Sequence, residues 1–283
     1  MNQPGASLTF GQRQGLEAMP SQLALGTLSP QLKALLWDAI HKSFMDHVKN
    51  KTHSTIKYLL SPWTTLVREY WVRRLFRNVD EVGDWRWSFQ VVKTIMTSDS
   101  HLTVFNFVQF LLERDDIPNG LSGAIQIALH ESRAAYRVID RLMVPVASDE
   151  QAHAVQIALA TVATSPAKGA ATHLRNAAGY LTQGRWSDSV RESISAVEGI
   201  AKSIEPTADT LGPALAKLKT SISLNPTLAS AFGKLYGYSS DEKGIRHALV
   251  FDGQPNVTER DALFMFGSCA SFVAFLVSAS SGK

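Results

Sequence analysis

The chain has 283 residues, enough for one large or two small domains, and 45% of them are hydrophobic while 19% are charged. This composition excludes an intrinsically disordered chain. The only cysteine, Cys269, excludes an intrachain disulfide and a cysteine-rich zinc site. The formal net charge of +3 is too small to establish a nucleic-acid partner by itself.

Apolar residues recur at helical spacing in four segments of the first half, which predicts a helix in each. Ser29 and Pro30 supply the capping residue and first-turn proline of the first helix, and Ser61 and Pro62 precede the second. The four segments are 32–44, 63–71, 101–112 and 121–135.

The stretch from His41 to Arg77 is strongly basic, with eight Lys or Arg and two acidic residues. It is either a surface that faces a polyanion or a solvated basic helix face, and both interpretations stay open. Tyrosine and tryptophan lie among its arginines and continue to Trp87, a mixture typical of single-stranded nucleic-acid binding. Because the same aromatic residues also fit an apolar core stripe, we retain only the arginines as candidates for binding RNA phosphates: Arg73, Arg74 and Arg77.

Residues 135–147 are rich in β-forming side chains on both sides of Asp140 and Arg141, which predicts a short β-hairpin. Pro145 restricts its second strand to an edge or an end. A second unit is expected to start near Ser148, so we predict domains over 1–148 and 149–283.

The second unit predicts further helices over 149–163, 169–181, 186–204 and 211–219. Another begins at Asn225 and Pro226 and is expected to end at the Tyr-Gly-Tyr run 236–238. A short helix is expected around 246–247, and Thr258 to Asp261 predicts a capping box that opens the last helix. The predicted fold is mainly α, with two helical domains, the second an antiparallel helical bundle, and a short β-hairpin near the end of the first.

The last helix contains no charged residue from 263 to 282 and approaches the length of a membrane span. Its serines and Gly267 dilute the hydrophobicity, so a buried bundle helix is favoured over a membrane anchor. Residues 1–21 contain no apolar segment typical of a secretion signal. We therefore expect a cytoplasmic protein with no membrane partner.

Arg246 lies beside His247 just after two carboxylates, where a turn leads into an apolar segment. Arginine can bind a phosphate through several donors, and histidine can transfer a proton near neutral pH, so the pair suggests phosphodiester cleavage. On the helix expected over 186–204, four polar residues share one stripe: Arg191, Ser195, Glu198 and Lys202. The stripe is either a solvated face with internal ion pairs or a polar seam that meets Arg246 and His247.

From Trp186 onward the chain resembles the HEPN-type domain of bacterial abortive-infection AbiJ-like proteins, and parts of the first half resemble the region attached to it. The resemblance lies in ESISAVE (192–198), TLG (210–212), KLYGYSSDE (234–242), GIRHAL (244–249), FM (264–265) and SC (268–269). Upstream it lies in FGQR (10–13), LW (36–37), 107–112 and AYR (135–137).

The resemblance implies a HEPN-like helical domain that dimerises and acts on RNA in antiviral defence, as a metal-independent endoribonuclease that needs no cofactor. His247 would transfer protons, Arg246 would stabilise the phosphate charge, and Glu198 would orient His247. The cations assigned to RNA in this domain are Arg191, Lys202 and Lys243. The partners implied are RNA, a second copy of the chain, and an antitoxin or a phage trigger.

The sequence departs from the usual HEPN signature, in which several residues separate the arginine from the histidine. Arg246 and His247 are adjacent, so they form either a variant catalytic site or a site that has lost catalysis. The alternative function is therefore a catalytically inactive HEPN-like module that binds nucleic acid or a partner protein. A toxin tethered to a membrane by the last helix is a third, less favoured interpretation.

Overall fold

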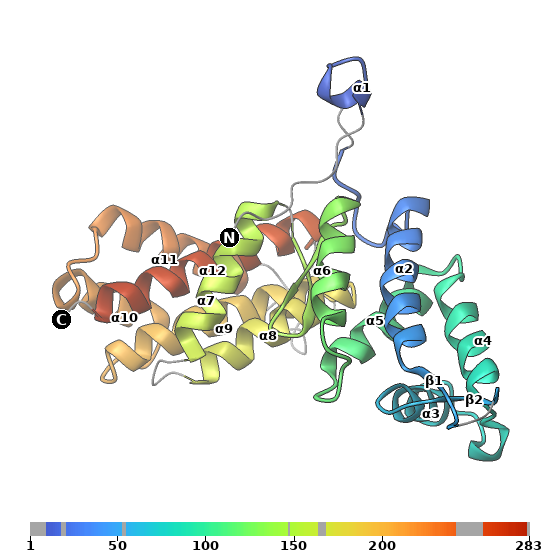
Figure 1. Cartoon of the computed structure of the whole chain (residues 1–283). Coiled ribbons are helices and arrows are strands. Elements are labelled where there is room, and N and C mark those ends of the chain that lie inside the picture. Colours follow the sequence, from blue (N-terminus) through green and yellow to red (C-terminus); the bar gives the residue numbers. More distant parts are fainter. Residues whose placement is uncertain are drawn as a thin grey trace. The chain divides into compact units, whose positions relative to one another are not determined.

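The computed structural model describes residues 10–17, 21–52, 55–146, 148–163, 168–241 and 257–281. It divides the chain into unit 1, Met1–Met143, and unit 2, Val144–Lys283, a few residues before the boundary that we predicted. The described chain is mainly helical with two short antiparallel hairpins, which confirms the predicted fold class (Figure 1).

Unit 1 consists of helices and of a small hairpin that lies in the chain between the second and the third helix. Its elements are α1 (Phe10–Arg13), α2 (Pro30–Asp46), β1 (Val48–Asn50), β2 (Lys57–Leu59), α3 (Trp63–Arg73), the 3-10 helix η1 (Val79–Glu81), α4 (Trp85–Met96), α5 (His101–Glu113), α6 (Leu121–Glu131) and β3 (Tyr136–Ile139). The strand β4 (Leu142–Pro145) spans the division and pairs with β3.

Side-chain caps fix several of these helices. Ser29 accepts a hydrogen bond from the backbone N–H of Leu32 at 3.1 Å, and Pro30 occupies the first turn, as predicted for α2. The Ser100 hydroxyl accepts from the N–H of Thr103 at 3.3 Å at the start of α5. Both caps are visible in the sequence because they need only residues adjacent to the helix.

The sequence analysis missed α4 and the β1–β2 hairpin, as well as the short helices α1 and η1. Asp84 is the N-cap of α4, and its carboxylate accepts from the N–H groups of Arg86 and Trp87 at 3.0 and 3.1 Å. The hairpin strands have three residues each, and Leu59 is their only buried side chain. A pattern that short has almost no periodicity to detect.

The core of unit 1 uses the aromatic residues of the basic stretch. Trp63 is fully buried against Phe44, with ring centroids 5.2 Å apart, and its indole N–H donates to the Ser43 hydroxyl at 3.2 Å. Tyr70 lies against Phe107 with ring centroids 4.8 Å apart, and burial raises its pKa. These two rings therefore stabilise the core and are not available to stack on bases.

The predicted hairpin over 135–147 is confirmed as β3 and β4. Asp140 and Arg141 both have positive φ, 50° and 67°, which is the conformation of a two-residue type I′ turn. The Arg141 guanidinium donates to the Leu112 carbonyl at 3.0 Å and to the Asp115 carboxylate at 2.6 Å, which holds the pKa of Asp115 below its usual value. Pro145 is the last residue of β4, as its missing N–H required.

Unit 2 is a bundle of long helices. They are α7 (Asp149–Ala163), α8 (Lys168–Thr182), α9 (Trp186–Ile204), α10 (Leu211–Ser221), α11 (Pro226–Asp241) and α12 (Glu259–Ser281). α12 packs against α7, α8 and α9, and Figure 1 shows it running beside α7 and α9.

The predicted end of α11 at 236–238 is wrong, because the helix continues through Gly237 to Asp241. Glycine lowers helix propensity, but Gly237 adopts no positive φ and the helix passes through it.

α12 begins with the predicted capping box. The Asp261 carboxylate accepts from the Thr258 N–H at 2.9 Å and from its hydroxyl at 2.7 Å, and the Asp261 N–H donates to Thr258 Oγ1 at 3.3 Å. These hydrogen bonds lower the pKa of Asp261.

The middle of α12 approaches α7 closely at Gly267. A Cβ at this position would collide with the Gln151 side chain, whose amide donates to the Leu263 carbonyl at 2.8 Å. By length and composition Glu259–Ser280 is apolar enough to cross a membrane, yet 56% of its apolar window is buried against the rest of the unit. A core helix of a bundle has the same properties. α12 therefore packs as the buried bundle helix that we expected.

Candidate functional site

The most conspicuous sequence motif lies outside the described residues. Arg246, His247 and Lys243 all fall within 242–256, between the end of α11 and the start of α12. The predicted seam between them and α9 is therefore neither confirmed nor contradicted. The remaining predicted residues of unit 2, Glu198 and two cations, lie on α9 within the described part.

The cations of the α9 stripe interact with their own unit. Arg191 donates to the Asp188 carboxylate at 2.5 Å, and Arg185 forms a second ion pair with the same carboxylate at 2.6 Å. Arg185 also stacks over the Tyr180 ring, 4.2 Å from its centroid. Lys202 donates to the backbone carbonyl of Asp209 at 3.1 Å. The structure therefore favours internal pairing along this stripe.

Next to these ion pairs lies an imidazole–carboxylate pair that the sequence analysis missed. His173 Nδ1 is 2.8 Å from Glu192 Oε2, and the Asn176 amide donates to the same oxygen at 3.2 Å. Because a carboxylate only accepts, Nδ1 carries the proton in this contact. The other ring nitrogen, Nε2, is left to accept or donate a proton, and the His173 side chain is 39% exposed. A fixed imidazole of this kind can serve as a general base or acid.

The close packing of α8 on α9 brings these residues together. Gly199 faces Ala170 closely enough that an added Cβ would lie 3.7 Å from the Ala170 side chain. Tyr180 near the end of α8 meets Arg185 just before α9, so the two helices run antiparallel and their polar edges align. We call this set the α8/α9 face; it consists of His173, Asn176, Tyr180, Arg185, Asp188, Arg191 and Glu192. Each helix contributes only part of the α8/α9 face, so the pattern of one helix could not predict it.

The arginines predicted in unit 1, Arg73, Arg74 and Arg77, are all exposed and lie at or just after the end of α3. Arg74 lies 3.8 Å from the Glu113 carboxylate of α5. The tryptophans near them, Trp71 and Trp87, are half-buried.

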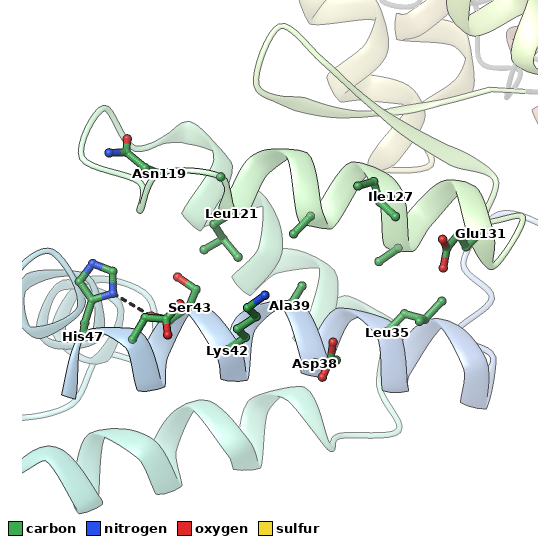
Figure 2. A pocket seen from close by; sticks show the side chains of 14 residues that line it. Leu35, Asp38, Ala39, Lys42, Ser43, His47, Asn119, Leu121, Ile127 and Glu131 are labelled. Carbon is green, nitrogen blue, oxygen red and sulfur yellow. Dashed lines mark hydrogen bonds between the residues drawn. The ribbon is translucent and has the colours of Figure 1, made fainter. Parts of the chain in front are cut away.

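Unit 1 also contains a groove of about 410 Å³ between α2 and α6 (Figure 2). Its floor is apolar, with Leu35 and Ala39 from α2 opposite α6. Three carboxylates line it, Asp38, Asp46 and Glu131, together with Lys42 and with His47, whose Nδ1 lies 2.7 Å from the Ser43 carbonyl. This excess of negative charge repels phosphate, so the groove does not suit RNA and fits a cationic ligand better.

No arrangement for a metal is present among the described residues, since no three His, Cys, Asp or Glu side chains are grouped to hold one. Cys269 is fully buried in α12, and burial raises its pKa to about 12, so its thiol is not a nucleophile in the folded protein. Comparison with known proteins found no matching family model, no matching curated protein and no matching solved structure. The chemistry of the site therefore follows from this chain's own residues.

Proposed function

We propose that this protein acts on RNA through unit 2, a HEPN-like helical domain, as a metal-independent endoribonuclease in the cytoplasm that takes part in bacterial antiviral defence. Support comes from the sequence resemblance over 186–270 and from the helical bundle that these residues form. The observation that carries the proposal is the α8/α9 face, where the imidazole of His173 on α8 is held by Glu192, the residue that follows the guanidinium-bearing Arg191 on α9. A second copy of the chain and an antitoxin or phage trigger belong to the same proposal.

The reaction would be attack of the RNA 2′-hydroxyl oxygen on the adjacent phosphorus. A general base takes the hydroxyl proton, the bond to the 5′-oxygen breaks, and a general acid protonates that oxygen, so the products are a 2′,3′-cyclic phosphate and a 5′-hydroxyl. His247 would supply one of these functions, Arg246 would bind the phosphate oxygens, and Glu198 would orient His247. Lys243 would add positive charge next to them.

The α8/α9 face offers a second imidazole for the same chemistry. Glu192 holds His173 through Nδ1, which orients the ring and leaves Nε2 for the substrate. Arg191 would have to leave Asp188 before it could bind a phosphate. The proposal therefore assigns proton transfer to two histidines, one from the sequence motif and one from the tertiary structure.

The second candidate function is a catalytically inactive HEPN-like module that binds nucleic acid or a partner protein. One observation favours it: Asp188 already pairs with both Arg185 and Arg191, and a carbonyl already accepts from Lys202. In this alternative the α8/α9 face stabilises the packing of the two helices and carries out no chemistry.

Cleavage of total RNA and of tRNA by the purified protein in EDTA separates the two functions. We expect cleavage by the wild type, a loss of about 100-fold or more in Arg246→Ala and His247→Ala, and a smaller loss in His173→Gln. His153→Gln is the matched control, because His153 is an exposed histidine on the neighbouring helix α7. Equal inactivity of every protein, with and without a phage lysate as the source of trigger, would favour the binding module.

A further inference from the structure

The first turn of α4 carries a tryptophan, Trp85, with two cations over its ring. The Lys57 ammonium, from β2, lies 5.8 Å from the centroid of the Trp85 ring, and the Arg86 guanidinium lies 5.1 Å from the same centroid. β2 contacts α4, so the hairpin that the sequence analysis missed is what brings Lys57 to this ring (Figure 1). Trp85 is half-buried, so the indole keeps part of its surface open to a ligand.

The end of α3 contacts the same turn of α4 through Trp87, two residues after Trp85. Trp71 packs against Trp87 with ring centroids 4.8 Å apart, and its indole N–H donates to the Asn78 carbonyl at 3.1 Å. The N–H of Arg77 donates to the Trp71 carbonyl at 3.1 Å, which folds residues 74–77 back over the last turn of α3. We call the set the basic aromatic surface; it consists of Lys57, Trp71, Phe76, Arg77, Trp85 and Arg86.

Phe76 is the most exposed aromatic ring of this set. Its exposed fraction is 86%, and its φ of 53° is a conformation that large side chains rarely adopt. The positive φ belongs to the C-terminal cap of α3, which the hydrogen bond from the Arg77 N–H to the Trp71 carbonyl closes. The exposure of the ring is not explained by packing, since the ring buries almost nothing, and it leaves the ring open to a ligand that stacks on it.

The charges of the basic aromatic surface select an anionic partner. Lys57 and Arg77 have no carboxylate partner among the described residues, and Arg86 has only a long contact to Asp84, at 3.6 Å. Three exposed carboxylates, Asp80, Glu81 and Asp84, lie between Arg77 and Trp85 in the chain and offset part of this positive charge. Cations and aromatic rings in alternation match the alternating phosphates and bases of a single strand.

We infer that the basic aromatic surface binds single-stranded RNA in a largely sequence-independent manner, with a base stacked on Phe76 and phosphates on Lys57, Arg77 and Arg86, while the Trp85 ring holds Lys57 and Arg86 in place. The choice of RNA rests on the proposed function. A duplex is disfavoured because its bases are already stacked on one another and only unpaired bases reach an aromatic ring. The surface lies in unit 1, separate from the residues assigned to cleavage in unit 2.

Binding of a labelled 12-nucleotide single strand with 2′-O-methyl riboses, measured by fluorescence anisotropy on the full chain, tests the inference. Methylation blocks attack by the 2′-oxygen, so binding is measured without cleavage. We expect Phe76→Ala to lower the affinity about tenfold, as for the loss of one stacked base. Trp85→Ala should lower it less, because it removes the ring that positions Lys57 and Arg86 and leaves both charges present. Leu102→Ala is the control for Phe76→Ala, because Leu102 is also an exposed apolar side chain of unit 1 and should leave binding unchanged.

Lys57→Glu is a second test of the inference, because it changes an exposed side chain whereas Trp85→Ala removes a partly buried one. Its matched control is Lys49→Glu: the register places Lys49 opposite Tyr58 and Lys57 opposite Asn50, so the two lysines project from opposite faces of one hairpin. Weaker binding by Lys57→Glu than by Lys49→Glu supports the inference, and equal binding by both overturns it.

Two further measurements distinguish RNA binding at this surface from membrane binding and from cleavage. Vesicles of phosphatidylcholine and phosphatidylglycerol should not bind, and binding to vesicles that requires Phe76 while the RNA strand does not bind would overturn the inference in favour of a membrane surface. Cleavage of unmodified RNA tests the proposed function separately. Wild-type binding of the methylated strand without any cleavage of the unmodified RNA contradicts the nuclease and leaves the RNA-binding surface standing.

Discussion

The α8/α9 face and the basic aromatic surface are built from similar side chains but differ in what neutralises their charge. On the α8/α9 face Asp188 pairs with two arginines and Glu192 with His173, all within unit 2. On the basic aromatic surface Lys57 and Arg86 lie over a tryptophan ring, and Lys57 has no carboxylate partner among the described residues. The first arrangement satisfies its charges internally, whereas the second leaves positive charge for an external anion.

This comparison corrects an inference that sequence alone allows. Arg191 and Arg77 are both at least partly exposed arginines, and by sequence both are candidates for binding phosphate. Their partners separate them, because an ion-paired guanidinium must lose one carboxylate to gain a phosphate. Counting cations therefore overestimates the RNA-binding capacity of α9.

Charge reversal on the basic aromatic surface should lower the affinity for RNA more than any other change. Lys57→Glu combined with Arg86→Glu should lower affinity for single-stranded RNA about 25-fold at 0.1 M salt, since each lost phosphate contact removes about 0.7 from the slope of log affinity against log salt. Arg191→Glu combined with Lys202→Glu should change affinity by about threefold or less. Anisotropy titrations over a range of salt concentrations measure both, and equal losses in the two double variants would contradict the comparison.

Protection from thiol labelling gives the next largest effect. The buried thiol of Cys269, with its pKa of about 12, should not react with maleimide in the folded protein, so it leaves no background. RNA at ten times its Kd should slow the labelling of Lys57→Cys about tenfold, because only the free fraction reacts.

Thr220→Cys on α10 is the matched position for this experiment, because Thr220 is exposed and belongs to neither surface. It should react at the same rate with and without RNA. Rapid labelling of Cys269 in the wild type would show that α12 is not buried as described. Equal protection of Thr220→Cys would show that the protection is not specific to the basic aromatic surface.

Removing the Asp188 carboxylate from the α8/α9 face should raise the affinity of unit 2 for RNA. Asp188→Asn leaves Arg185 and Arg191 without their ion pairs, so unit 2 should gain RNA affinity, about fivefold at 0.1 M salt for one new phosphate contact. The partly exposed pairs contribute about 1 kcal/mol at most to the free energy of unfolding. Urea titration measures that loss, and unchanged RNA affinity would show that these guanidinium groups cannot reach a phosphate.

The smallest effect on RNA concerns α12, which supports unit 2 without belonging to either surface. Thr258→Ala removes the capping box and should lower the free energy of unfolding by about 1 kcal/mol with no change in RNA affinity. The wild-type contribution should depend on pH, since the folded pKa of Asp261 is lowered. It is present above the usual carboxyl pKa and is lost as pH falls through the lowered value. Urea titrations at pH 7 and at about pH 2 measure the difference between the two proteins, and an equal difference at both values would exclude this role of the carboxylate.

Local signals in the sequence predicted most of the helices. Ser29 with Pro30 and Thr258 with Asp261 act on the backbone next to them, so their structural consequence is contained in a few adjacent residues. Asp140 and Arg141 likewise form the turn that the pattern on either side of them required. The exceptions include the β1–β2 hairpin and α4, which have short or mixed apolar patterns, although Asp84 was a visible cap.

Sites that join two elements could not be predicted in the same way. His173 and Glu192 lie on different helices, and neither helix indicates by its own pattern which residue will face the other. Lys57 and Trp85 are likewise far apart in the chain, and only the packing of β2 on α4 brings them together. The sequence did identify the α9 stripe, but the two arginines share Asp188 because of side-chain conformations that spacing alone does not specify.

Three properties of this protein follow from its sequence: that it is mainly helical, where most of its helices begin, and that cations and aromatic residues are frequent between 41 and 87. Each depends only on composition or on residues within one or two helical turns. The tertiary structure alone decided which aromatic rings are core, as for Trp63, and which lie beside cations at the surface, as for Trp85. It also decided which charges are satisfied internally. The physical reason is that burial and ion pairing depend on neighbours from other elements, and those neighbours are fixed only when the helices pack.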